Sequence, residues 1–199
     1  MTLDEGIDAL GLALPTETRI KLQAYLTLLQ KWNRVYNLTA VRDPEQMVTH
    51  HLLDSLAVLP HLAGVTTLAD VGSGGGLPGL ILAACRPDLV LTSVEANQKK
   101  AAFQQQAKIE LGLTNVSIHC GRVESMVGCF DAVLSRAFAE LADFVRWSGH
   151  LSHRLFAMKG LYPETELTRL PSDWRVAQVI KLVVPGLDAE RHLIVLEKT

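Results

Sequence analysis

The sequence has few cysteines, no long apolar run and no excess of basic residues. Its three cysteines, Cys85, Cys120 and Cys129, show no CxxC spacing. A disulfide scaffold and a cysteine-rich zinc site are therefore excluded, we expect no metal, and a reducing cytoplasm is the expected setting. No apolar run approaches the roughly 20 residues of a membrane helix. The first ten residues are acidic and contain no base, so we expect neither a secretory signal nor a membrane partner.

The charge balance also limits the possible functions. Lysine and arginine number 19 against 21 aspartate and glutamate residues, a formal net charge of −2. Proteins that bind nucleic acid through net charge are usually basic, so a nucleic-acid role must depend on a local basic face. Hydrophobic residues make up 48% of the chain and charged residues 20%, which excludes a disordered protein. The length of 199 residues favours one hydrophobic core.

Two parts of the chain differ in periodicity. Residues 1–66 are predicted to be helical, with the longest helix starting near Thr16, and residues 67–199 alternate strands and helices. A turn is predicted at 185–188, between the last two strands. The predicted strands are 66–71, 89–95, 116–120, 132–137, 154–160, 176–184 and 191–198, and two of the predicted helices are 98–111 and 138–148.

This order of elements predicts an α/β fold. Strands that alternate with helices form a mostly parallel sheet, and the closing hairpin adds one antiparallel strand, so we expect seven strands in total. We expect residues 1–66 to form an N-terminal helical extension that packs on a core domain at 67–199.

A glycine-rich segment from Asp70 to Gly79, DVGSGGGLPG, follows the first predicted strand. Glycine lets the backbone approach a ligand closely, and the start of the next helix presents N–H donors to an anion. Two interpretations compete. Gly74-x-Gly76-x-x-Gly79 matches the dinucleotide motif of nicotinamide oxidoreductases. The alternative is the acid-x-Gly-x-Gly-x-Gly pattern, beginning at Asp70, of the S-adenosylmethionine site in Rossmann-like methyltransferases.

The context favours the methyltransferase interpretation. The acid ends the first strand, a helical layer precedes that strand, and the chain closes with a hairpin. A Tyr-x-x-x-Lys dyad, which a hydride-transfer enzyme would need, is missing. Glu95 ends the second strand, where a carboxylate can accept both ribose hydroxyls. After the third strand, Val123 is placed to pack on adenine and Glu124 to contact its exocyclic edge.

Missing motifs restrict the methyl acceptor. No Asn/Asp-Pro-Pro-Tyr follows the fourth strand, which disfavours adenine N6, and no Pro-Cys is present, which disfavours cytosine C5. Guanine N7 remains compatible. It loses no proton on methylation, so we expect no catalytic general base and a site that acts by positioning.

Three basic residues follow strand ends and are the predicted RNA contacts: Arg122, Arg136 and Lys159. Because the carboxyl ends of parallel strands share one edge, we expect these three side chains to gather round the mouth of the cofactor site. Lys159 is predicted to hold a phosphate or guanine O6.

Over nearly its whole length the chain resembles the bacterial 16S ribosomal RNA guanine-N7 methyltransferases, the glucose-inhibited division protein B family. The segments that carry this resemblance are KWNRVYNLTA at 31–40, HLLDSL at 51–56, DVGSGGGLPG at 70–79, RVE at 122–124, SRAFA at 135–139 and AMKG at 157–160. Two positions depart from the family pattern: Gly75 stands where proline is common, and Glu95 stands where aspartate is common.

The resemblance implies a Rossmann-like class I methyltransferase fold and transfer of a methyl group from S-adenosylmethionine to N7 of one guanine, at position 527 of 16S rRNA. It implies cofactor contacts by Gly72, Leu77, Val123, Glu124 and Arg136. Gly74 belongs to the same motif and is also assigned to the cofactor. The expected partner is 16S rRNA or the small ribosomal subunit, and we expect a monomer. Three alternatives stay open: a methyltransferase for another substrate, a nicotinamide oxidoreductase and a non-catalytic RNA-binding assembly factor.

Overall fold

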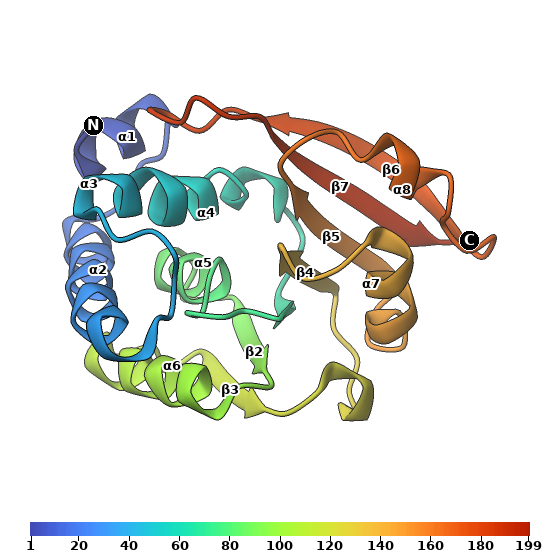
Figure 1. The fold of residues 1–199 in the computed structure, drawn as a ribbon, viewed down its shortest axis with the longest axis horizontal. Coiled ribbons are helices and arrows are strands. Elements are labelled where there is room, and N and C mark those ends of the chain that lie inside the picture. The colour runs from blue at the N-terminus through green and yellow to red at the C-terminus, as the bar shows by residue number, and fades with distance from the viewer.

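Seven strands form one sheet in the order β3-β2-β1-β4-β5-β7-β6 (Figure 1). The computed structural model describes residues 1–199. β1 to β5 pair in parallel, and β7 runs antiparallel to both of its neighbours. The predicted α/β fold with one antiparallel strand is therefore confirmed. The strands are β1 Thr67–Val71, β2 Val90–Glu95, β3 Val116–Cys120, β4 Ala132–Arg136, β5 Arg154–Lys159, β6 Trp174–Leu182 and β7 Arg191–Lys198.

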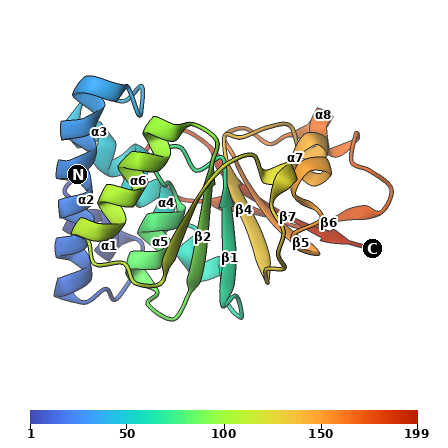
Figure 2. The same ribbon diagram turned by 90° about the horizontal axis from the view of Figure 1, so that it is seen from below.

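Helices cover both faces of the sheet (Figure 2). None of them combines the length and the apolar character that crossing a lipid bilayer requires. The α-helices are α1 Leu3–Ala9, α2 Thr16–Tyr36, α3 Pro44–Met47, α4 Asp54–Leu56, α5 Gly79–Cys85, α6 Gln98–Glu110, α7 Leu141–Ser148 and α8 Glu164–Leu167. A π-helix, η1 at Val48–Leu53, joins α3 to α4, and two short 3₁₀ turns are η2 at Leu59–His61 and η3 at Val123–Ser125.

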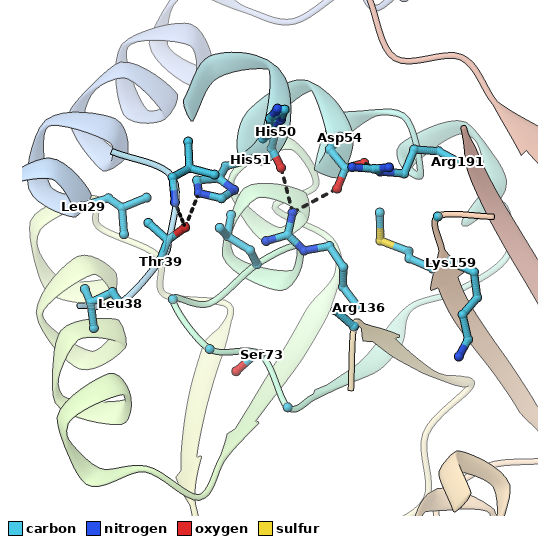
Figure 3. A pocket seen from close by; sticks show the side chains of 18 residues that line it. Leu29, Leu38, Thr39, His50, His51, Asp54, Ser73, Arg136, Lys159 and Arg191 are labelled. Atoms are coloured by element: carbon cyan, nitrogen blue, oxygen red, sulfur yellow. Dashed lines mark hydrogen bonds and ion pairs between the residues drawn. The ribbon is translucent and has the colours of Figure 1, made fainter. Parts of the chain in front are cut away.

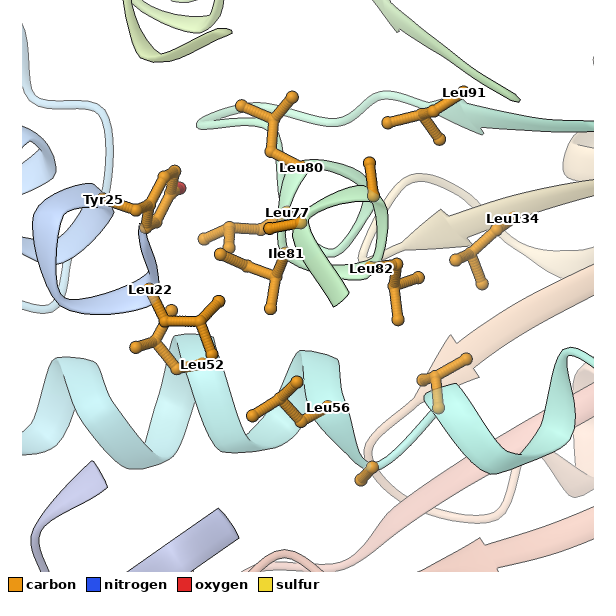
Figure 4. Close-up of a cluster of buried hydrophobic side chains, with 14 of the residues drawn as sticks. Leu22, Tyr25, Leu52, Leu56, Leu77, Leu80, Ile81, Leu82, Leu91 and Leu134 are labelled. Carbon is orange, nitrogen blue, oxygen red and sulfur yellow. The ribbon is translucent and has the colours of Figure 1, made fainter. Parts of the chain in front are cut away.

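The N-terminal helices form an outer layer on one side of the sheet. On α2, Leu22, Tyr25, Leu26 and Leu29 are buried, as their helical spacing predicts. They pack against α5 and α6, which in turn cover the sheet. Figure 4 shows the α5 side chains between the N-terminal helices and the strand residues Leu91 and Leu134. One hydrophobic cluster of 38 buried residues thus runs from the N-terminal layer into the sheet.

Parallel pairing places the ends of the central strands at one edge. Val71, the last residue of β1, lies opposite Val94 on β2 and Ser135 on β4. The segments that follow β1, β2 and β4 therefore leave the sheet side by side. In open α/β sheets this carboxyl edge is where ligands bind.

Two predicted segments differ from the structure. The helix expected at 138–148 begins only at Leu141, because the N-cap residue Glu140 is extended, with ψ of 154°, and Ala137 before it has a left-handed backbone with φ of 52°. The turn expected at 185–188 is part of a longer connection between Leu182 and Arg191, which pair across the hairpin. In that connection, a Cβ added to Gly186 would lie 3.1 Å from Thr49, so the loop packs on the N-terminal layer.

Candidate functional site

The glycine motif turns the chain sharply between β1 and α5. Gly72, Gly74 and Gly76 have φ of 67°, 58° and 81°, a left-handed conformation that side chains with a Cβ rarely adopt. A Cβ added to Gly72 would lie only 2.2 Å from the Phe138 ring. The loop therefore depends on glycine both for its conformation and for the space it leaves.

Side chains from two helices fix this loop. The Tyr25 hydroxyl, on α2, donates to the Gly75 carbonyl at 2.7 Å. Gln104 Nε2, on α6, donates to the Gly74 carbonyl at 2.7 Å and to Ser73 Oγ at 2.8 Å. The sequence indicated Tyr25 only as a core residue and did not single out Gln104. The only sequence feature that could have indicated Gln104 is its position on α6, on the same face as the buried residues Phe103 and Ala107.

Asp70 connects the end of β1 to the start of α5. Its Oδ2 accepts a hydrogen bond from the Gly79 N–H at 2.8 Å, while Oδ1 is buried without a partner. Complete burial raises the pKa of this carboxyl to about 7. The acid of the motif therefore holds the strand and the helix together beneath the loop.

We predict that Asp70 changes how stability depends on pH. The folded protein binds more protons at Asp70 than the unfolded chain between about pH 4 and pH 7, so this group lowers stability as the pH rises. Burial lowers the pKa of His51 to about 4, and that group acts in the opposite direction, because the unfolded chain binds more protons. In Asp70→Asn, stability should therefore rise more steeply between pH 4.5 and 6.5 than in the wild type. Urea unfolding at several pH values measures this; parallel curves would contradict it.

Two cavities border Gly72, and the smaller of these two lies over the ends of β2 and β3. This β2–β3 cavity has a volume of about 310 Å³. It brings together five of the residues that the sequence assigned to a ligand site: Gly72, Glu95, Arg122, Val123 and Glu124. Val123 is buried and gives the cavity an apolar wall, whereas Arg122 and Glu124 are exposed at its rim.

Glu95 is held at the bottom of this cavity by backbone groups. Its Oε2 accepts from the Gly74 N–H at 2.8 Å, and its Oε1 accepts from the Asn97 N–H at 2.7 Å. A carboxylate oxygen has two lone pairs, so each oxygen can still accept a bond from a ligand hydroxyl. Only 8% of the residue is exposed, so its position is well defined.

The larger of these two cavities, the β4–β7 cavity, has a volume of about 610 Å³. Figure 3 shows side chains of its lining, among them Thr39, Arg136 and Lys159. The N-terminal layer forms one wall, and the ends of β4 and β5 with the start of β7 form another. Residues of this lining include Leu38, Thr39, His50, His51, Asp54, Gly72, Gly74, Leu77, Arg136, Met158, Lys159 and Arg191. Gly72 lines both cavities, so they meet at the glycine motif.

The Asn-Leu-Thr-Ala segment forms part of the wall made by the N-terminal layer. Asn33 Oδ1 accepts from the Thr39 N–H at 2.9 Å, and Thr39 Oγ1 is bonded to His51 Nε2 at 2.9 Å. Burial keeps His51 neutral, with its pKa lowered to about 4. These contacts give the segment a fixed shape next to the cavity.

The three predicted RNA-binding cations do not gather as one cluster. Arg122 lines the β2–β3 cavity, whereas Arg136 and Lys159 line the β4–β7 cavity. The reason is the strand order, because β3 and β5 lie four strand spacings apart, roughly 19 Å. Lys159 Nζ also donates to Glu166 Oε2 at 2.7 Å and to the Ala139 carbonyl at 2.8 Å.

Arg136 is held by a group that the sequence analysis did not assign to the site. Its Nη1 donates to the His50 carbonyl at 3.0 Å and to Asp54 Oδ2 at 2.9 Å. Asp54 also accepts from Arg191 Nε at 2.9 Å. In the sequence, Asp54 was marked only as an acidic residue within the apolar HLLDSL segment. Arg191 appeared only as the first residue of a predicted strand.

The sequence is similar to one family over most of its length. The GidB family profile, described as rRNA small subunit methyltransferase G, matches residues 18–194. A ribosomal RNA small subunit methyltransferase G from Aromatoleum aromaticum is 60% identical, over 99% of this chain and 98% of that protein. A protein of the same name from Neisseria meningitidis serogroup B is 56% identical, over 98% and 97%.

Solved structures with low sequence identity share the fold. Magnesium protoporphyrin IX methyltransferase from Synechocystis, solved with bound S-adenosylmethionine, has a TM-score of 0.59 at 15% identity, over 94% of this chain and 99% of that chain. The mitomycin 7-O-methyltransferase MmcR has a TM-score of 0.62 at 15% identity, over 74% and 53%. These neighbours agree with the Rossmann-like methyltransferase fold that the sequence predicted.

Proposed function

The chain belongs to the ribosomal RNA small subunit methyltransferase G family, and we propose that within this activity it methylates N7 of one guanine of 16S rRNA, the guanine at position 527. It is an enzyme that transfers a methyl group from S-adenosylmethionine to ribosomal RNA, and it acts on 16S rRNA or the small subunit. The nicotinamide oxidoreductase alternative finds no support in the family or in the fold neighbours.

The residues of the site fit S-adenosylmethionine. We assign the ribose hydroxyls to Glu95, which lines the β2–β3 cavity and whose carboxylate oxygens keep lone pairs for them. Val123 packs on adenine and Glu124 reaches its edge. Gly74, where an added Cβ would meet nothing within 4 Å, leaves open space for the amino-acid part of the cofactor, and Gly72 borders both cavities. Leu77 and Arg136, on the wall of the β4–β7 cavity, complete the proposed contacts.

One observation carries the functional assignment: the two cavities meet at Gly72. When bound, S-adenosylmethionine supplies an electrophilic methyl group on a sulfonium centre. Glu95 would hold the ribose of the cofactor in the β2–β3 cavity, and the β4–β7 cavity is large enough to admit a nucleotide. The site would therefore act by positioning these two partners relative to each other.

Guanine N7 is the acceptor that this site suits best. It carries an in-plane lone pair and loses no proton on methylation, so no side chain has to act as a base. His51 lines the β4–β7 cavity, but its Nε2 is engaged by Thr39 and its Nδ1 is buried. The remaining task of the chain is to orient the acceptor and exclude water.

The test is methyl transfer to small subunits from a strain that lacks this gene. Purified protein and radiolabelled S-adenosylmethionine should label 16S rRNA, and borohydride–aniline cleavage should then reveal 7-methylguanine at position 527. Label at another base or another atom would reject the guanine-N7 assignment. If S-adenosylmethionine binds but neither the RNA nor the subunit becomes radiolabelled, the methyltransferase function is rejected.

We predict that Glu95→Ala weakens S-adenosylmethionine binding. The substitution removes hydrogen bonds from a charged acceptor, a loss of about 1–3 kcal/mol, or roughly 5- to 150-fold in Kd. Isothermal titration calorimetry measures the change. Glu110→Ala, at an exposed acid on α6, is the matched control and should bind as the wild type does. Unchanged affinity in Glu95→Ala would remove this residue from the site.

We further propose the setting and organisation of the enzyme. The ribosomal substrate supports a cytoplasmic location without a membrane partner. We also propose that the enzyme acts as a monomer. The division into a helical extension at 1–66 and a cofactor-binding domain at 67–199 remains a proposal, supported by the first strand starting at Thr67. Arg122, Arg136 and Lys159 remain proposed RNA contacts; Lys159 must exchange its Glu166 partner to reach a phosphate.

A further inference from the structure

Asp54 connects two arginines on the wall of the β4–β7 cavity. Its Oδ2 is 2.9 Å from Arg136 Nη1 and its Oδ1 is 2.9 Å from Arg191 Nε, and its side chain is 3% exposed. The acid comes from α4 in the N-terminal layer, and the arginines come from β4 and β7. Figure 3 shows both arginines directed toward this carboxylate.

The charges around this acid do not balance. The cavity lining contains one carboxylate, Asp54, and three cationic side chains, those of Arg136, Lys159 and Arg191. Glu166 pairs with Lys159 and neutralises it. A single aspartate cannot neutralise both arginines, so one positive charge remains on the wall of a partly enclosed cavity. A cation in such a place favours an anionic ligand.

Arg191 has the donor that such a ligand needs. Its Nε is used by Asp54 and its Nη1 donates to the Glu190 carbonyl at 2.8 Å, while Nη2 makes no hydrogen bond. The Arg191 side chain is 25% exposed. The neighbouring Gly160 also lines the cavity, and a Cβ added there would still lie 3.9 Å from Arg191 Nη1. The guanidinium is therefore partly exposed, and its Nη2 keeps its donors for a ligand.

The backbone next to Asp54 shows that this arrangement is built into the fold. The π-helix η1 ends at Leu53, immediately before Asp54. Single π-turns are rare and occur often at functional sites. Within η1, the His50 carbonyl accepts from Arg136. The same short segment therefore supplies two of the groups that orient the arginine pair.

The chemistry of the acceptor indicates which anion is bound. Methylation at N7 places a positive charge on the guanine ring, so a cation held against the base would oppose the reaction. The nucleotide's phosphate carries a constant negative charge, and arginine binds phosphate with a planar, multiply donating group. On the basis of the proposed function, we propose that Arg191, oriented by Asp54 as a positioning residue, binds a backbone phosphate of the target nucleotide.

Arg191→Ala tests this proposal. Binding to unmethylated small subunits should weaken about tenfold, and the slope of log affinity against log salt should decrease by about one unit. KM for the subunit should rise with a smaller change in kcat. The Kd for S-adenosylmethionine should stay within twofold of the wild type. Arg175→Ala, which breaks an exposed ion pair with Glu197 on the same hairpin, is the matched control and should change none of these values.

Two results would overturn the proposal. An unchanged subunit affinity and salt slope in Arg191→Ala would remove the phosphate contact, and a parallel loss of S-adenosylmethionine affinity would assign the arginine to the cofactor carboxylate. Asp54→Asn tests whether Asp54 acts by positioning Arg191. This variant should reduce the salt slope as Arg191→Ala does, and the double variant should lose no more subunit affinity than either single variant. Because wild-type protein is assayed in parallel, failure of the methyltransferase function itself would be recognised independently.

Discussion

Gly72→Val is expected to abolish measurable binding of S-adenosylmethionine while the protein remains folded. The new Cβ would lie 2.2 Å from the Phe138 ring, and Phe138 lines the β2–β3 cavity, so the ring must move into the space proposed for the ligand. Valine is also strained at φ of 67°. Calorimetry should show a loss of more than about 100-fold in affinity, equivalent to about 2.7 kcal/mol.

Gly112→Val is the matched control for the backbone strain in this experiment. Gly112 has φ of 63°, close to that of Gly72, and a Cβ there meets nothing within 4 Å. This variant should lose stability by roughly 1–2 kcal/mol but retain cofactor binding. If both variants bind S-adenosylmethionine equally well, Gly72 does not border the cofactor site.

Asp54→Ala is expected to lower the free energy of unfolding by about 3 kcal/mol. Removing one partner of a buried ion pair leaves an uncompensated charge, which costs about 3–5 kcal/mol. The lower end applies here because Arg136 and Arg191 are 21% and 25% exposed and are partly hydrated. Urea unfolding of the wild type and the variant measures the difference.

Asp143→Ala provides the comparison with a surface pair. Asp143 accepts from Arg146 one helical turn away, and the two side chains are 38% and 67% exposed. Such a pair contributes about 0.5 kcal/mol or less. Equal losses in the two variants would show that Asp54 contributes no more than a surface acid, and would also weaken its role as a positioning residue.

The sequence predicted those parts of the fold that depend on local periodicity. Residues 116–120 and 191–198 were predicted as strands and form β3 and β7 with the same bounds. The helix starting near Thr16 and the glycine motif between β1 and α5 are also where the pattern indicated. In each case the signal lies in adjacent residues, because side-chain alternation and helix boundaries are properties of short segments.

The segment after β4 had no such local signal. Alanine has no preference for the left-handed conformation, so nothing in the sequence marked Ala137 as a turn. The helix was therefore predicted three residues too early, at 138 in place of Leu141. Phe138, which follows this turn, lies against Gly72, so two segments that are 66 positions apart meet here.

The sequence by itself determined the fold class, the glycine motif and the candidate cofactor residues, because each of these follows from short segments or from the end of a strand. Only the tertiary structure decided which charges meet. Asp54 pairs with arginines 82 and 137 positions away, and strand order separates Arg122 from Lys159. Ion pairs of this kind act over a few ångströms in space and carry no periodic signal along the chain, so their partners are fixed only when the sheet and the helical layer pack together.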